Sequence, residues 1–176
     1  MRDRVFESFF EKQRNEAQAL VAQSSLLSLE HEPGLYPRRY MARFYCKTLV
    51  IQEGEFSDHL GFAVGIDFPP DYLRVAPEPG RLLGLLWPKE IWHPNVRYPF
   101  VCIGKVRSGT PLVEILFRVF EVLTYQRYTP NEMDALNQEA CAWARNQIAR
   151  FPVDSRPLKL SAPNFEVSAL EEGAVA

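Results

Sequence analysis

The chain has 176 residues, of which 47% are hydrophobic and 24% are charged, which fits one globular domain and excludes general disorder. Its 20 Lys and Arg against 22 Asp and Glu give a formal net charge of -2 at pH 7, so no bulk positive charge favours nucleic acid or an anionic membrane. The three cysteines, Cys46, Cys102 and Cys141, are too few and too widely spaced for a disulfide framework or a metal knuckle. We expect no metal, no cofactor, no membrane span and a cytoplasmic location.

The chain begins with a predicted amphipathic helix over residues 5–27, where apolar residues recur every three or four positions. A stretch rich in proline and glycine, 29–39, ends it. Alternating apolar residues then predict two strands, 43–52 and 61–68, joined as a hairpin by the polar turn 53–59. A third strand is predicted at 81–87. The long segment 88–109 has no regular pattern, and such segments often carry function.

Two more helices are predicted in the second half of the chain. One begins at Pro111 after a Thr110 cap, and the other runs from Glu132 until Pro152 stops it. Because helices and strands are grouped rather than alternating, we predict an α+β fold: an N-terminal helix, an antiparallel meander sheet, an active-site segment and two C-terminal helices. Residues 1–151 form the predicted domain, and 152–176 form an extended or mobile tail.

The irregular segment contains His93-Pro94-Asn95, followed seven residues later by Cys102. An aromatic and proline turn precedes this pair, at 66–72, and a Pro-Asn segment with an aspartate follows it, at 129–136. In this order the motifs resemble those of the ubiquitin-conjugating enzymes. The resemblance covers about residues 1–150 and implies the fold of that family, with an enzyme that carries a ubiquitin-like protein as a cysteine thioester.

The resemblance implies a role for each motif residue. Cys102 is the nucleophile that takes the acyl group from one thioester and holds it as another. Asn95 donates a hydrogen bond to the oxyanion that forms when an amine attacks. Asp134 orients the attacking lysine, and His93 braces the turn, with Pro94 restricting its backbone to extended conformations.

The resemblance also implies protein partners and a setting. The partners are an activating enzyme, the ubiquitin-like protein itself and a lysine of a target protein. The first helix would meet the activating enzyme through its basic residues. The basic residues concerned are Arg2, Arg4, Lys12 and Arg14. Arg74 stands where eukaryotic members carry an aromatic residue that docks ligases, and the usual Leu-Asp pair after the cysteine is missing. Such departures are similar to bacterial homologues encoded in operons that are linked to defence against phage.

Three other interpretations stay open at this stage. Cys102 between Val101 and Ile103 also fits a buried, inert thiol. A catalytically inactive variant of the same fold would bind a ubiquitin-like protein without thioester chemistry. A cysteine hydrolase would use Cys102 with His93 as its base.

Overall fold

The computed structural model describes residues 4–78 and 80–160, and it begins with the predicted helix. Helix α1 spans Arg4–Ala22 and buries one side, including Phe10, Ala17 and Leu20. The helix ends five residues earlier than predicted. Strand β1, Leu27–His31, begins where the helix was predicted to end and pairs with the next strand, so the prediction of helix up to residue 27 and of irregular chain from residue 29 is wrong. Arg2 lies outside the described residues.

A six-stranded antiparallel sheet follows in the order β1-β2-β3-β4-β6-β5. Its other strands are β2 (Arg39–Gln52), β3 (Glu55–Asp67), β4 (Leu83–Trp87), β5 (Val96–Arg97) and β6 (Phe100–Val101). The turn between β2 and β3 is shorter than predicted, because only Glu53 and Gly54 lie between the strands. Both have a positive φ, 52° and 85°, as in the tight turns that match the twist of a hairpin.

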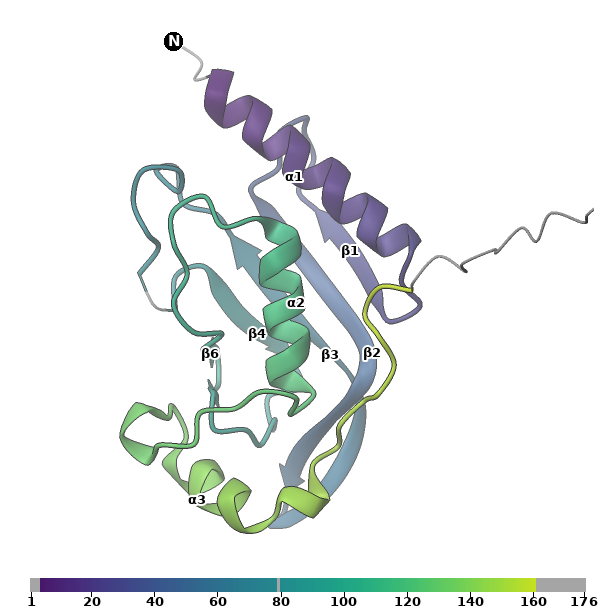
Figure 1. Cartoon of the computed structure of the whole chain (residues 1–176), viewed down its shortest axis with the longest axis vertical. Helices are drawn as coiled ribbons and strands as arrows, with labels where there is room; N and C mark the ends of the chain where they lie inside the picture. The colour runs from purple at the N-terminus through teal and green to yellow at the C-terminus, as the bar shows by residue number, and fades with distance from the viewer. Residues whose placement is uncertain (1–3, 79, 161–176) are drawn as a thin grey trace, which may run out of the picture.

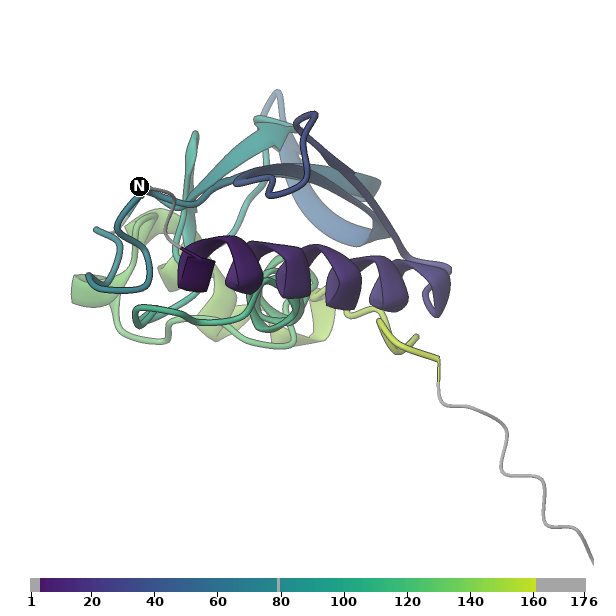
Figure 2. The ribbon, with the colours of Figure 1, turned by 90° about the horizontal axis from the view of Figure 1, so that it is seen from above.

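Helices α1 and α2, Leu112–Leu123, lie on the same face of the sheet (Figures 1 and 2). The core lies between these helices and the sheet, and it includes inward side chains of the central strands such as Phe44, Phe62 and Ile66. Pro111 precedes α2 in an extended conformation, and the Thr110 hydroxyl bonds to the Arg107 backbone instead of to the helix.

The third predicted helix is interrupted. The 3-10 turn η1, Glu132–Asp134, comes first, α3 spans only Gln138–Asn146, and the 3-10 turn η2, Ile148–Arg150, follows. Asn137 causes the break, because its side chain caps α3 by accepting a hydrogen bond from the Ala140 N–H at 3.0 Å. The observed helix, antiparallel sheet and two later helices confirm the α+β prediction.

Residues 152–160, which we call the strap, run along β2 toward the end of α1 (Figure 1). Leu158 is 1% exposed, and the Leu160 N–H donates to the Gln23 carbonyl at 2.9 Å. The rest of the predicted tail, 161–176, lies outside the described residues. None of the helices in the described part of the chain combines the length and the apolar character that a membrane crossing requires.

Candidate functional site

Asn95 stands at the centre of a hydrogen-bond network that includes Cys102. Its side-chain N–H groups donate to the Cys102 carbonyl at 3.0 Å and to the Thr129 hydroxyl at 2.9 Å, and its oxygen accepts from the Thr129 N–H at 2.8 Å. The Cys102 N–H in turn donates to the Asn95 carbonyl at 2.8 Å. Asn95 therefore holds the backbone of Cys102 on both sides, and both of its side-chain N–H groups are already engaged.

His93 lies fully buried beneath this network. Its Nδ1 accepts a hydrogen bond from the Asn95 N–H at 2.9 Å, and the Tyr125 ring packs against the imidazole at 4.3 Å between centroids. Burial lowers the pKa of His93 from 6.5 to about 3, and the Arg127 backbone opposes this only in part. Among the described residues, Nε2 has no hydrogen-bond partner within normal geometry. At neutral pH the ring is therefore uncharged and braces the turn.

The three cysteines differ in their access to solvent. Cys46 and Cys141 are both 0% exposed, whereas Cys102 is half-buried, and all three are free thiols. Burial, and secondarily the nearby Asp154 carboxylate, raises the pKa of Cys46 to about 12. Cys141 donates its S–H to the Thr129 carbonyl at 3.3 Å, and burial raises its pKa as well. Cys102 is thus the cysteine that a reagent or partner can reach.

Asp134 is exposed on η1. Its carboxylate accepts a hydrogen bond from the Asn131 side chain at 2.9 Å. Within 4–78 and 80–160, no hydrogen bond joins Asp134 to Cys102 or to Asn95. The segment that carries it is nevertheless tied to the motif, because the Asn137 N–H donates to the Pro94 carbonyl at 3.0 Å.

Sequence reasoning missed three residues of this site. Thr129 closes the Asn95 network, and Tyr125, 3% exposed, donates its hydroxyl to the Trp92 carbonyl while covering His93. The Arg127 guanidinium lies close to Gly104, which comes two residues after Cys102. A Cβ added at Gly104 would stand 3.6 Å from Arg127 Nη2. Nothing local marks Tyr125 or Arg127, since both reach the motif only through the loop after α2. Thr129 does begin the Pro-Asn segment.

The aromatic turn before the motif anchors the chain that leaves Cys102. Tyr72 is 0% exposed, donates its hydroxyl to the Thr110 carbonyl at 2.8 Å, and accepts from the Gly109 N–H through its own carbonyl at 3.1 Å. Burial raises the pKa of Tyr72 to about 12, so the hydroxyl remains a donor. The turn therefore fixes the end of this segment that leads into α2.

No family model matches the chain, and a search of curated proteins found no match.

Proposed function

We propose that the chain is a conjugating enzyme of the ubiquitin-conjugating type, which accepts a ubiquitin-like protein on Cys102 and transfers it to a lysine amine. The observation that carries this proposal is the Asn95 network. It holds a half-buried cysteine between two backbone hydrogen bonds, directly beside the motif that resembles the family. An acyl carrier needs such a fixed, reachable thiol, whereas an inert core thiol does not.

The proposed reaction has two acyl transfers. The Cys102 thiolate attacks the thioester carbonyl on the activating enzyme, whose own thiolate leaves. A lysine amine then attacks the new thioester, loses its proton to water or to a carboxylate, and expels the Cys102 thiolate as the isopeptide bond forms. Asp134, exposed on η1, is the carboxylate that we assign to the incoming lysine.

The environment of His93 argues against the hydrolase interpretation. A dyad base must accept the thiol proton at neutral pH through a free ring nitrogen. Here Nδ1 already accepts the Asn95 N–H, Nε2 is buried, and the low pKa of His93 leaves it a poor base.

One observation favours the non-catalytic binding module as a second candidate. Because both N–H groups of the Asn95 side chain are engaged, stabilising an oxyanion requires Asn95 to release either the Cys102 carbonyl or the Thr129 hydroxyl. A protein that only holds a ubiquitin-like partner has no need for that release.

The decisive experiment combines the chain with ATP, the activating enzyme and the ubiquitin-like protein of the same source. We expect an adduct that reductant removes and that Cys102→Ala abolishes. Cys102→Ser should give an adduct that resists reductant but not alkali, because an oxygen ester replaces the thioester. Cys46→Ala and Cys141→Ala are the matched controls and should leave the adduct in place.

Brief alkylation of the native chain separates the two candidates further. If iodoacetamide does not reach Cys102 in the native chain and no adduct forms with any of the partners, the binding module is favoured over the conjugating enzyme. If the adduct persists in Cys102→Ala, the proposed chemistry is wrong.

A further inference from the structure

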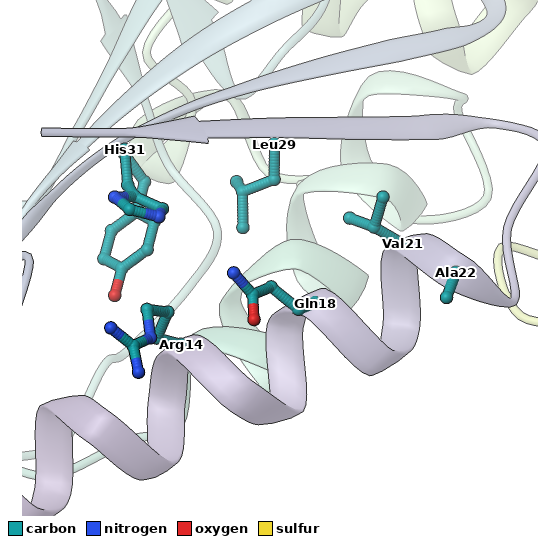
Figure 3. Close-up of a pocket in the computed structure, with 7 residues that line it drawn as sticks. Arg14, Gln18, Val21, Ala22, Leu29 and His31 are labelled. Carbon is teal, nitrogen blue, oxygen red and sulfur yellow. The ribbon is translucent and has the colours of Figure 1, made fainter. Parts of the chain in front are cut away.

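A small cleft lies between α1 and β1. Arg14 and Gln18 project from the helix, and Leu29 and His31 project toward them from the strand (Figure 3). Val21 and Ala22 on the next helical turn, together with Tyr40 of β2, complete the lining of a cavity of about 230 Å³. The polar groups gather toward Arg14 and the apolar ones toward Val21, so the cleft has one polar end and one apolar end.

The polar end contains a buried hydroxyl without a partner. Tyr40 is 4% exposed, yet its hydroxyl forms no hydrogen bond with any described residue. Buried polar groups are almost always hydrogen-bonded, because an unpaired one loses its bonds to water without replacement. Burial raises the pKa of Tyr40 to about 12, so the group is a neutral donor at physiological pH.

The charges around Tyr40 favour a single negative charge. The Arg14 guanidinium donates through Nη1 to the Leu35 carbonyl at 3.1 Å, which fixes the side chain and leaves its other donors for a ligand. His31 lies with its ring centroid 6.0 Å from that of Tyr40, and its Nδ1 is engaged by the Glu32 carbonyl. The Glu32 carboxylate also acts on Tyr40, but it accepts the backbone N–H groups of Arg38 and Arg39 and so is held in the loop.

We propose that this cleft binds a carboxylate that is attached to a small aliphatic group. The carboxylate would take hydrogen bonds from Arg14, Gln18 and the Tyr40 hydroxyl, and the aliphatic part would contact Val21, Ala22 and Leu29. This inference is independent of the chemistry proposed for Cys102. In the sheet order, β1 stands at one edge and the β5–β6 hairpin beside Cys102 at the other.

Size and charge exclude larger or more highly charged ligands. A cavity of about 230 Å³ is below the usual range for drug-sized molecules and suits a short acid or one side chain. A phosphate carries nearly two charges, and the single guanidinium that lines the cleft balances only one of them.

The test is a titration of the full chain with isocaproate, followed by ¹⁵N–¹H NMR. We expect shifts confined to residues that line the cleft, with a Kd on the order of 1 mM for so small a ligand. Isocaproamide, which lacks the charge, should bind at least about tenfold more weakly. A parallel titration with acetyl-leucyl-glutamyl-amide distinguishes a side-chain carboxylate from a free acid, and binding of either supports the proposal.

Two variants and one control complete the test. Tyr40→Phe and Arg14→Gln should each weaken isocaproate binding about tenfold, whereas Lys12→Gln removes a charge from the same helix outside the cleft and should not change it. Because the Tyr40 hydroxyl lacks a partner, Tyr40→Phe should melt no lower than the wild type. The proposal is overturned if neither isocaproate nor the peptide binds at a concentration about ten times the expected Kd. It is also overturned if Tyr40→Phe binds isocaproate as tightly as the wild type does.

Discussion

A single buried imidazole makes folding sensitive to pH. The pKa of His93 is lowered by burial to about 3, against 6.5 for a free side chain, so between these values the unfolded chain binds a proton that the folded chain excludes. Stability must therefore fall as pH drops below about 6.5. From pH 7 to pH 5 we expect a loss of about 2 kcal/mol, measured by urea unfolding at both pH values.

The matched variant is His93→Asn, whose side-chain oxygen replaces Nδ1 as the acceptor of the Asn95 N–H but does not titrate. His31 and His59 are present in both proteins, so their contribution cancels in the comparison. If the wild type and His93→Asn lose equal stability between pH 7 and pH 5, His93 does not stay unprotonated in the folded state.

The Asn95 side chain should support stability as well as the site. Asn95→Ala removes three hydrogen bonds and leaves the Cys102 carbonyl and the Thr129 N–H unpaired, so we expect a loss of about 3 kcal/mol in urea unfolding. Asn95→Asp keeps the acceptor for Thr129 but places a carboxylate against the Cys102 carbonyl. If Asn95→Ala unfolds like the wild type, the network does not position Cys102.

At the scale of elements, the strap bonds to β2 beyond the last residues that pair with β1. The register of β1 and β2 ends at the pair Leu27 and Phe44, and the register of β2 and β3 shifts between Phe44 and Lys47. The Lys47 N–H donates to the Asp154 carboxylate at 3.4 Å, and Arg156 donates to the Tyr45 carbonyl at 3.1 Å. Asp154 and Arg156 also bind each other through two side-chain hydrogen bonds, of 2.9 and 2.6 Å.

Removing the charge of Asp154 should detach the strap from β2. Asp154 is 7% exposed, and its hydrogen bonds to Arg156 lower its pKa from 3.8 to about 2. A lowered carboxyl pKa contributes stability above pH 3.8 that disappears as pH falls toward 2. We expect Asp154→Asn to lose about 2 kcal/mol at pH 7 and less at pH 3, by chemical denaturation.

Asp58→Asn is the control, because Asp58 pairs with the Lys47 ammonium at 3.4 Å but is 52% exposed. An exposed pair of this kind contributes little. Equal effects of the two substitutions would mean that the strap contributes no more than a surface ion pair.

The elements that the sequence predicted well are those in which the spacing of apolar residues within the element determines its secondary structure. α1, α2 and the β2–β3 hairpin each carry a buried face at helical or alternating spacing. β1 was missed because Leu26 and Leu27 continue the helical pattern, while its strand state depends on pairing with β2, whose partner residues lie between His31↔Tyr40 and Leu27↔Phe44 in the register. The break before α3 combines the local Asn137 cap with a hydrogen bond from the Asn137 N–H to the Pro94 carbonyl, and no local pattern encodes this second contact.

The candidate site divides in the same way. His93, Asn95 and Cys102 come from one stretch and were proposed through its resemblance to the family motif. Thr129 bonds to Asn95 across 34 positions of the chain, and Tyr125 bonds to Trp92 across 33, so only the fold joins them to the site.

At the scale of the whole molecule, the two proposed sites stand at opposite edges of one sheet. No buried polar chain described in residues 4–78 or 80–160 links Tyr40 to Cys102, so substitutions at the two sites should be additive. We expect Cys102→Ala to bind isocaproate with the wild-type Kd, and Tyr40→Phe to keep the reactivity of Cys102 toward iodoacetamide. A change of more than about threefold in either measurement would reveal coupling across the sheet.

The chain also closes on itself, because the strap brings residue 160 back to the end of α1. Leu158 fills the core at 1% exposure, and the Leu160 N–H meets the Gln23 carbonyl. Ending the chain after Phe151 removes this buried leucine and the Asp154 bonds, each worth about 2 kcal/mol, so we expect a loss of about 4 kcal/mol or outright unfolding. Ending it after Leu160 keeps every contact named above and should preserve the midpoint of urea denaturation.

Leu158→Ala in the full chain measures the part of the loss that comes from packing of this leucine. Equal midpoints for the two truncated chains would show that the sheet and helices hold together without the strap.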